Sequence, residues 1–204
     1  MAVKENNQVH IEVPGGETTV LLHTCCAPCS SAIIEAMLKN GITPVIYYCN
    51  PNIYPLEEYE IRKNECTRYA QSLGLEIVDA DYAHEDWLEA VKGLENEPER
   101  GERCYKCYNL RLEETAKVAD ELGFDFFATT LTLSPYKKAD WLNEIGSCLD
   151  KKYNSTYLYS DFKKKNGYKR SIELSYQYDM YRQDYCGCVY SKRDYLDRKK
   201  NTSD

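Results

Sequence analysis

Residues 18–48 read TTVLLHTCCAPCSSAIIEAMLKNGITPVIYY, and this stretch decides the fold. The apolar run at 18–24 predicts a buried strand. The spacing of apolar residues within 30–40 predicts a helix that ends at Gly41, and 44–48 predicts a second strand. A strand, a helix and a second strand in close succession are typical of a parallel unit with a right-handed crossover.

The same alternation continues along the chain. It predicts helices at 55–73, 108–122 and 137–152, and strands at 75–78 and 124–130. This pattern indicates an α/β fold, a parallel sheet flanked by helices. Residues 153–204 lack strand signals, and we expect short helices there at 171–185 and 192–200. We expect one domain, in which 18–152 form the α/β core and 153–204 form a helical and looped C-terminal extension over an edge of the sheet.

Charge is distributed unevenly along the 204 residues, whose net charge is −7. Residues 1–150 hold 13 Lys and Arg against 26 Asp and Glu, a net −13, whereas 151–204 hold 13 against 7, a net +6. Ten of the 19 tyrosines also lie in 151–204. A basic, Tyr-rich segment fits RNA, because cations meet phosphates and rings stack on bases. A solvated charged face above packed tyrosines is the alternative, and composition does not separate the two.

The cysteine content indicates the kind of chemistry. Residues 1–16 contain no apolar stretch typical of a secretion signal, and no apolar run approaches the ~18 residues that a membrane span needs. We therefore expect a soluble cytoplasmic protein. In a reducing compartment, ten cysteines indicate metal binding or redox chemistry rather than a disulfide framework.

Two cysteine pairs are candidates for a metal centre: the adjacent Cys25 and Cys26, and the spaced Cys104 and Cys107. Both pairs lie near predicted helix starts, where the helix dipole favours the thiolate that binds metal. The surplus adjacent thiol favours a [4Fe–4S] cluster. Alternatively, Cys26 and Cys29 would join the spaced pair around zinc, or CAPC (26–29) would be a thioredoxin-like redox motif.

The remaining cysteines are interpreted separately. From the residues alone, Cys186 and Cys188 are either a redox-active pair, whose disulfide would be strained, or two unrelated thiols in a turn, and the second interpretation is preferred. Cys49, Cys66 and Cys148 are expected in the core. Because open parallel sheets bind ligands beyond the carboxyl ends of their strands, the cysteines after 18–24 and the loop after 124–130 are expected to face one crevice.

Four motifs, taken together, resemble the cobalamin-independent epoxyqueuosine reductase family. They are LLHTCCAPCS (21–30), ERCYKCYNLRLEETA (102–116), TTLTLSPYKK (129–138) and QDYCGCVYS (183–191). The resemblance spans roughly residues 18–193. It implies a Rossmann-like fold and the last step of queuosine synthesis, in which the epoxide oxygen of epoxyqueuosine at the wobble position of tRNA is removed to give queuosine.

The resemblance also implies the cofactors. It places a [4Fe–4S] cluster on Cys25, Cys26, Cys104 and Cys107. It assigns a redox-active disulfide to Cys186 and Cys188, against the preference from the residues alone. A second, mononuclear metal ion, expected to be iron, is implied beside the cluster. Cys29 is a candidate ligand of that ion, although some members carry aspartate at this position.

The implied partner is tRNA carrying epoxyqueuosine, and we also expect an external electron donor of the ferredoxin or flavodoxin type. We expect the second metal ion to polarise the epoxide oxygen and the Cys186/Cys188 pair to cycle between dithiol and disulfide. Loop 130–138 is expected to line the pocket, with Tyr136 or Lys137 as a proton or phosphate contact. The expected contacts to tRNA phosphates are Lys163, Lys164, Lys165, Lys169 and Arg170.

Two other functions remain open from the sequence. One is a thioredoxin-like thiol–disulfide oxidoreductase, and the other is a zinc-stabilised RNA-binding module. The colour and metal content of protein purified without oxygen separate them from an iron–sulfur reductase. Brown protein with iron and sulfide indicates the reductase, metal-free protein the oxidoreductase, and colourless zinc protein the RNA-binding module.

Overall fold

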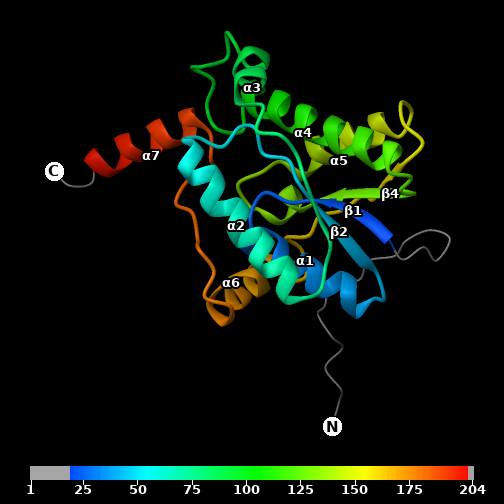
Figure 1. Ribbon diagram of the computed structural model, residues 1–204. Helices are drawn as coiled ribbons and strands as arrows, with labels where there is room; N and C mark the ends of the chain where they lie inside the picture. Colours follow the sequence, from blue (N-terminus) through cyan, green and yellow to red (C-terminus); the bar gives the residue numbers. More distant parts are fainter. Residues whose placement is uncertain (1–18, 202–204) are drawn as a thin grey trace.

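The computed structural model describes residues 19–201, and a parallel sheet lies at its centre. Its strands are β1 (Thr19–His23), β2 (Thr43–Tyr48), β3 (Ile77–Asp79), β4 (Phe126–Thr129) and β5 (Thr156–Tyr157). They lie in the order β3-β2-β1-β4-β5, and every neighbouring pair is parallel (Figure 1). This is the order of a doubly wound, Rossmann-like sheet, so the predicted α/β fold is confirmed.

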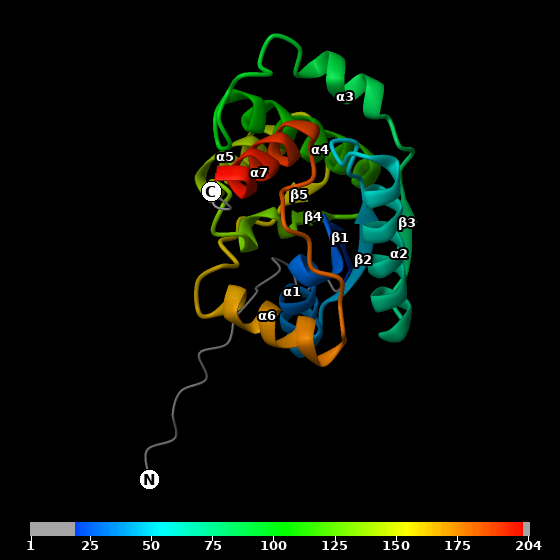
Figure 2. The same cartoon turned by 90° about the vertical axis from the view of Figure 1, so that its left-hand side faces the viewer.

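Helices cover both faces of the sheet (Figures 1 and 2). One face is covered by α1 (Ala27–Lys39), α2 (Leu56–Ser72) and α6 (Gly167–Gln177), and the other by α4 (Glu102–Glu121) and α5 (Ala139–Leu149). Two further helices, α3 (His84–Ala90) and α7 (Val189–Asn201), lie at the periphery, and α7 projects from the body in Figure 1.

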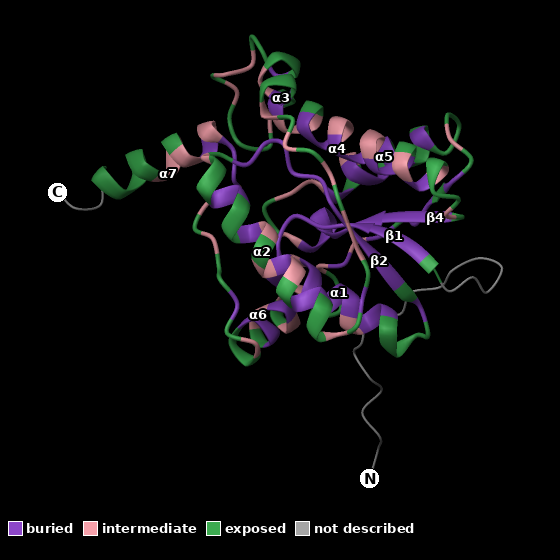
Figure 3. Cartoon of the chain, viewed as in Figure 1, coloured by how far each residue is buried: buried purple, intermediate pink, exposed green. Residues whose placement is uncertain are grey.

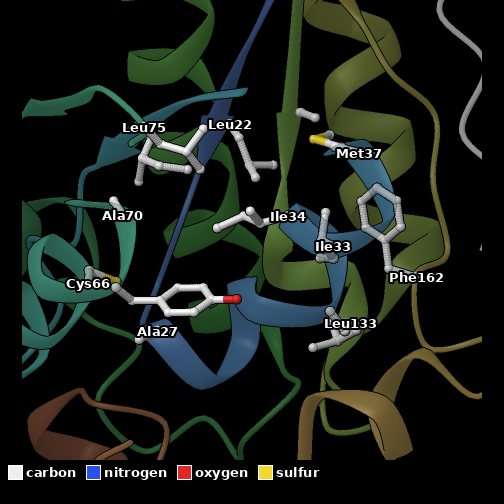
Figure 4. Close-up of a cluster of buried hydrophobic side chains, with 14 of the residues drawn as sticks. Leu22, Ala27, Ile33, Ile34, Met37, Cys66, Ala70, Leu75, Leu133 and Phe162 are labelled. Atoms are coloured by element: carbon white, nitrogen blue, oxygen red, sulfur yellow. The ribbon is translucent and has the colours of Figure 1, made fainter. Parts of the chain in front are cut away.

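The core lies in two layers because both faces of the central strands are covered. Leu22 of β1 packs with Ile33 and Met37 of α1 on one face, as Figure 4 shows. Leu21, the next residue along the strand, points to the opposite face and packs in a cluster with Leu112 of α4. Buried residues accordingly run along β1, β2 and β4, while the outer faces of the helices are exposed (Figure 3). A strand buried on both faces reads as a continuous apolar run, which explains residues 18–24.

Several elements differ from the sequence-based expectation. Helix α4 begins at Glu102 rather than at 108, because nothing in ERCYKC breaks a helix. Helix α6 ends at Gln177 rather than at 185. The short α3 and β5 were not predicted, since seven and two residues carry too little periodicity to detect. Within residues 19–201, no helix combines the length and the apolar character that crossing a membrane requires.

One expectation about the core is wrong. Cys148 was expected to be buried, but it lies on the exposed side of α5. Cys49 and Cys66 are buried, as expected. The sequence of α5 places Cys148 one residue before the buried Leu149, and an apolar residue beside a core position is not itself directed inward. The residues at 1–16 on which the secretion argument rests lie outside the described part of the chain.

Candidate metal centre

Three cysteine sulfurs converge where β1 passes into α1. The strand ends at His23, Cys26 is the extended residue before the helix, and Pro28 in the first turn fixes the helix start. The Cys25, Cys26 and Cys29 sulfurs all lie within 4.8 Å of one another. The Cys25 and Cys26 sulfurs are 3.9 Å apart. Strand order reverses between β1 and β4, so this turn lies at the switch point where open sheets bind ligands.

The three thiols share protons unequally. Hydrogen bonds from the Cys26 and Cys29 thiols hold the pKa of Cys25 well below its usual range, against the effect of burial. Burial raises the pKa of Cys26, and donation to Cys25 raises the pKa of Cys29. Cys25 is therefore the one of the three that ionises most readily, with Cys26 and Cys29 as its proton donors. A metal ion would replace those two protons, since thiolates are the ligands that soft metals take.

Buried cations surround these sulfurs. Arg111 of α4 is 2% exposed, and its charge acts on both Cys25 and Cys107. It donates to the Asn50 side chain over 2.5 Å, and its Nε has no partner. Arg62 of α2 lies close enough to Cys26 to interact electrostatically with its sulfur. Converging sulfurs with buried positive charge around them fit an anionic, thiolate-ligated metal group.

The second predicted pair lies in the first two turns of α4. Cys104 packs against the apolar cluster that contains Cys25 and Cys26. Cys107 packs instead with Cys188 and Trp87. The backbone N–H of residue 100 donates to the Cys104 sulfur over 3.2 Å. Among the described residues, the group of sulfurs within 4.8 Å is limited to the three at the start of α1, so the structure does not bring the α4 pair into it.

The CGC turn at 186–188 is held against α2. Arg62 donates to the carbonyl of Cys186 over 3.0 Å and to that of Tyr185 over 3.3 Å. Gly187 has φ +133°, and a side chain there would approach Arg62 and Ile53, so only glycine suits this turn. All ten cysteines lie among the described residues, and no disulfide joins any two of them in this structure.

A cavity of about 560 Å³ opens beside these sulfurs. Cys25 and Cys29 line it from one side and Cys186 from another. Loop residues 133, 134, 136 and 137 line it as expected from the sequence, together with Tyr168 of α6 and residues 182–185. The arrangement places thiols from two segments around one space of the size that a nucleoside-like ligand occupies.

Lys137 is one of the cations that line this cavity, together with Arg182 and Arg198. Burial disfavours its charge, but the nearby Cys186 and Cys25 sulfurs outweigh burial and raise the pKa of the ammonium. Lys137 therefore keeps its proton at neutral pH and presents it beside both cysteine groups. This supports the expectation that the loop after β4 contributes a proton-bearing side chain to the pocket.

His23 has a structural place beneath the cysteines. Burial lowers its pKa to about 3, so the ring is neutral. Its Nε2–H donates to the carbonyl of Cys49 over 3.0 Å, and its Nδ1 then accepts from the Thr129 hydroxyl over 2.8 Å. The ring thus ties the carboxyl ends of β1 and β4 together and fixes the floor of the crevice.

Some site residues could not be identified from the sequence. Arg62 lies in none of the four motifs, and charged helical residues normally point to solvent. Gln183 is the first residue of the motif QDYCGCVYS, but its residue type alone gives it no role. Arg111 does lie within the matched stretch ERCYKCYNLRLEETA, four residues after Cys107, and that spacing places it on the same helix face. That spacing is the one signal in the sequence that could have identified it.

The basic residues expected to contact tRNA are only partly available. Lys163 and Lys164 pair with Asp161, and Arg170 pairs with Glu35 and Glu173. Lys165 and Lys169 take part in none of the ion pairs of the described residues, and they line a second cavity, of about 420 Å³, between α1 and α6. Tyr168 of the same helix lines the first cavity, so α6 separates the two.

Comparison with known proteins agrees with this site. The model of the family described as epoxyqueuosine reductase QueH matches residues 20–194. A protein of Haemophilus influenzae named epoxyqueuosine reductase QueH is 45% identical over 186 residues, which cover 90% of this chain and 76% of that protein. Proteins with the same name from Streptococcus pyogenes and Thermotoga maritima are 42% and 35% identical, over 86% and 85% of this chain and 71% and 90% of their own length.

Proposed function

The chain belongs to the epoxyqueuosine reductase QueH family, and on this premise we propose that it reduces the epoxide of epoxyqueuosine in tRNA to give queuosine at an iron–sulfur centre. The family match includes every candidate cysteine. The observation that carries the iron–sulfur part is the convergence of three sulfurs within 4.8 Å at the wall of a cavity. Buried cations around them compensate the charge that thiolate ligands bring.

The proposed ligands of a [4Fe–4S] cluster are Cys25, Cys26, Cys104 and Cys107. Cys104 already packs against the apolar cluster of the first pair, and Arg111 lies near sulfurs of both pairs, which supports a common centre. Cys29 is left to ligate a mononuclear ion, proposed to be iron. When bound, these groups would supply electrons one at a time and a Lewis acid for the epoxide oxygen.

Protein residues would supply the protons. Removing the epoxide oxygen as water takes two electrons and two protons, and a carbon–carbon double bond replaces the two carbon–oxygen bonds. Lys137 holds a proton at Nζ beside the cavity and is proposed to deliver it to the oxygen that leaves. Oxidising the Cys186 and Cys188 thiols to a disulfide releases two electrons and two protons, the amounts that one turnover requires, and an external donor of the ferredoxin or flavodoxin type would restore the dithiol.

The tRNA substrate would enter through the cavity. A wobble base must leave its stack to reach sulfurs inside the protein. Tyr136 lies 66% exposed at the cavity and offers a ring on which a base can stack. This arrangement fits a nucleotide flipped out of the anticodon loop, with the polynucleotide remaining outside.

The test is nucleoside analysis of epoxyqueuosine-containing tRNA after incubation with reduced, anaerobically reconstituted protein. We expect queuosine to appear, and iron and sulfide to reach about four each per cluster. Cys25→Ala and Cys107→Ala should lose the cluster and turnover. Cys148→Ala, on the exposed side of α5, should retain both and is the matched control.

Cys186→Ser tests the dithiol separately. This variant should keep the iron and sulfide of the wild type but turn over poorly. Normal turnover would contradict the dithiol role and leave the ligand assignment standing. Protein that contains only zinc, or that is metal-free and reduces disulfides, would contradict the iron–sulfur function altogether.

A further inference from the structure

Gln183 connects the C-terminal extension to the cysteines after β1. Its side-chain Nε2 lies 3.0 Å from the Cys26 sulfur and 3.9 Å from the Cys29 sulfur. These contacts join residues more than 150 positions apart in the chain. Gln183 also lines the cavity, three residues before Cys186.

The segment that carries Gln183 is fixed on both sides. Before it, the Tyr181 hydroxyl donates to Glu58 over 2.9 Å. After it, Arg62 donates to the carbonyls of residues 185 and 186, and the same arginine pairs with Glu58 over 2.7 Å. Arg62 is 1% exposed, so this anchor is part of the core. The backbone on either side of Gln183 is therefore anchored to α2, and this places its amide beside the sulfurs.

Metal binding by the sulfurs would fix the direction of their hydrogen bonds with Gln183. A metal-bound thiolate accepts hydrogen bonds and has no proton to donate. The amide must then present N–H to sulfur, and it carries two such groups for two sulfurs. Hydrogen bonds to the sulfurs are among the determinants of the potential of an iron–sulfur centre, because they withdraw electron density and favour the reduced form.

We propose that Gln183 is a positioning residue that donates N–H to the metal-bound sulfur of Cys26, and thereby raises the reduction potential of the cluster and ties the segment bearing Cys186 to it. This inference rests on the proposed function, since it requires the cluster to form. Its consequence is that the C-terminal extension sets how readily the centre accepts an electron. A change in the CGC turn would reach the cluster through this amide.

The experiment is a potentiometric titration of the reconstituted cluster, followed by its electron paramagnetic resonance signal. Gln183→Leu, which keeps the volume but has no donor, should shift the midpoint potential to more negative values at unchanged iron content. Gln183→Glu, of equal length but with a carboxylate that cannot donate when ionised, should shift it further. Gln177→Leu, on the exposed end of α6, is the matched control and should leave the potential unchanged.

The outcomes separate this inference from the proposed function. If the wild type holds the cluster and both Gln183 variants share its potential, the inference is wrong while the function stands. If the wild type takes up no cluster under reconstitution, the function fails and the inference with it. If Gln183→Leu loses the cluster, Gln183→Asn replaces it in the comparison, because the asparagine amide is one methylene too short to reach Cys26. An unshifted midpoint potential in Gln183→Asn would likewise overturn the proposal.

Discussion

Two buried arginines, Arg62 and Arg111, lie beside the cysteines of this site. Arg62 and Arg111 are 1% and 2% exposed, and a buried guanidinium is costly unless it is compensated. Arg62 has Glu58 as a partner. None of the ion pairs among residues 19–201 involves Arg111, whose neighbours are instead Cys25, Cys107 and an asparagine. Its charge therefore favours the thiolate form of Cys25 and Cys107, which is the form in which cysteine binds a metal.

The Arg62–Glu58 pair predicts a large effect on stability. Arg62→Met removes the partner of a carboxylate that is itself 9% exposed, together with two hydrogen bonds to the CGC turn. Breaking a buried pair in this way typically costs about 3–5 kcal/mol. We expect a loss of that order in the free energy of unfolding, measured by anaerobic urea denaturation. Lys92→Met breaks an exposed pair between the turn after α3 and Glu89 of α3, and should cost less than about 1 kcal/mol. Equal losses in the two variants would contradict the buried role.

The contacts of a single side chain can be predicted from the sequence only when its partners lie nearby in the sequence. Cys25, Cys26 and Cys29 are close in sequence, so their convergence could be predicted from one turn. Gln183 reaches Cys26 across the molecule, and nothing near either residue indicates that contact. Residue types alone also mislead, as Cys148 shows, because an amphipathic helix carries apolar side chains on its exposed face as well as on its buried one.

Among the secondary-structure elements, helix α5 packs closely on the edge strand β5. A Cβ at Gly146 of α5 would enter the ring of Tyr157 in β5, so this glycine sets how closely the two elements approach. Helix propensity alone would favour alanine by about 1 kcal/mol. Overpacking against a buried ring typically costs about 1–3 kcal/mol, so the steric effect should win.

Gly146→Ala should therefore lower the free energy of unfolding by up to about 2 kcal/mol. Ser147→Ala, on the exposed face of the same helix, should be neutral or slightly stabilising. Combining Tyr157→Leu with Gly146→Ala should recover part of the lost stability, because the ring that the new methyl group meets is gone. Urea denaturation of Gly146→Ala, Ser147→Ala, Tyr157→Leu and the Gly146→Ala/Tyr157→Leu double variant measures this. A stabilised Gly146→Ala protein would show that α5 and β5 are not in the close contact described.

An ion pair joins α1 to α6 and predicts a pH dependence. Arg170 donates through two nitrogens to Glu35, over 2.8 and 2.9 Å. The guanidinium lowers the pKa of Glu35 below its ordinary value. Because the pKa of Glu35 is lower in the folded state, the ion pair contributes its full stabilisation above the unfolded-state pKa of about 4.3. This stabilisation is lost as the pH falls through the pKa of the folded state.

We expect Glu35→Gln to be less stable than the wild type by about 0.5–1 kcal/mol at pH 7, because the pair is partly exposed. The difference should shrink as the pH falls below about 4. Urea denaturation at several pH values measures it, with Glu89→Gln of the exposed α3 pair as the control. A difference that stays constant down to pH 3 would assign the effect to packing rather than charge.

Elements were predicted as well as their length and context allowed. Strands buried on both faces and helices ended by glycine, such as α1 before Gly41, were identified close to their observed bounds. The start of α4 was placed six residues late because the cysteine spacing suggested a loop. Placing both cysteines inside the helix fixes their relative position by helical geometry, so that they lie on one side of α4 about one turn apart.

The whole molecule combines an acidic body with a basic end, although its net charge is −7. An acidic protein can bind a polyanion only through a localised basic surface. Helix α6 supplies one beside the cavity, since Tyr168 lines the cavity with the cysteines and Lys169 lies on the other side of the helix. Recognition of the tRNA backbone and reduction of its base would then be separated by the width of one helix.

Lys165 and Lys169 should carry most of this binding, because the other three basic residues of this region are already paired with carboxylates. Each phosphate contact contributes roughly 0.7–0.9 to the slope of log K against log salt concentration. The double variant Lys165→Gln/Lys169→Gln should therefore bind tRNA more weakly and reduce that slope by about 1.4–1.8. Filter binding or fluorescence anisotropy at several salt concentrations measures it.

The matched control is Lys92→Gln/Lys117→Gln, which removes the same charge from the turn after α3 and from α4, where each lysine pairs with a glutamate. If tRNA binding depends on a localised surface, this control should keep the wild-type slope of log K against log salt concentration. A change in net charge elsewhere alters the long-range attraction, but it removes no phosphate contact and so changes no counterion release. Equal weakening in both double variants would show that α6 has no special part in docking. An unchanged slope in the α6 variant would place the phosphate contacts elsewhere on the molecule and would leave the cavity, rather than this helix, to orient the tRNA.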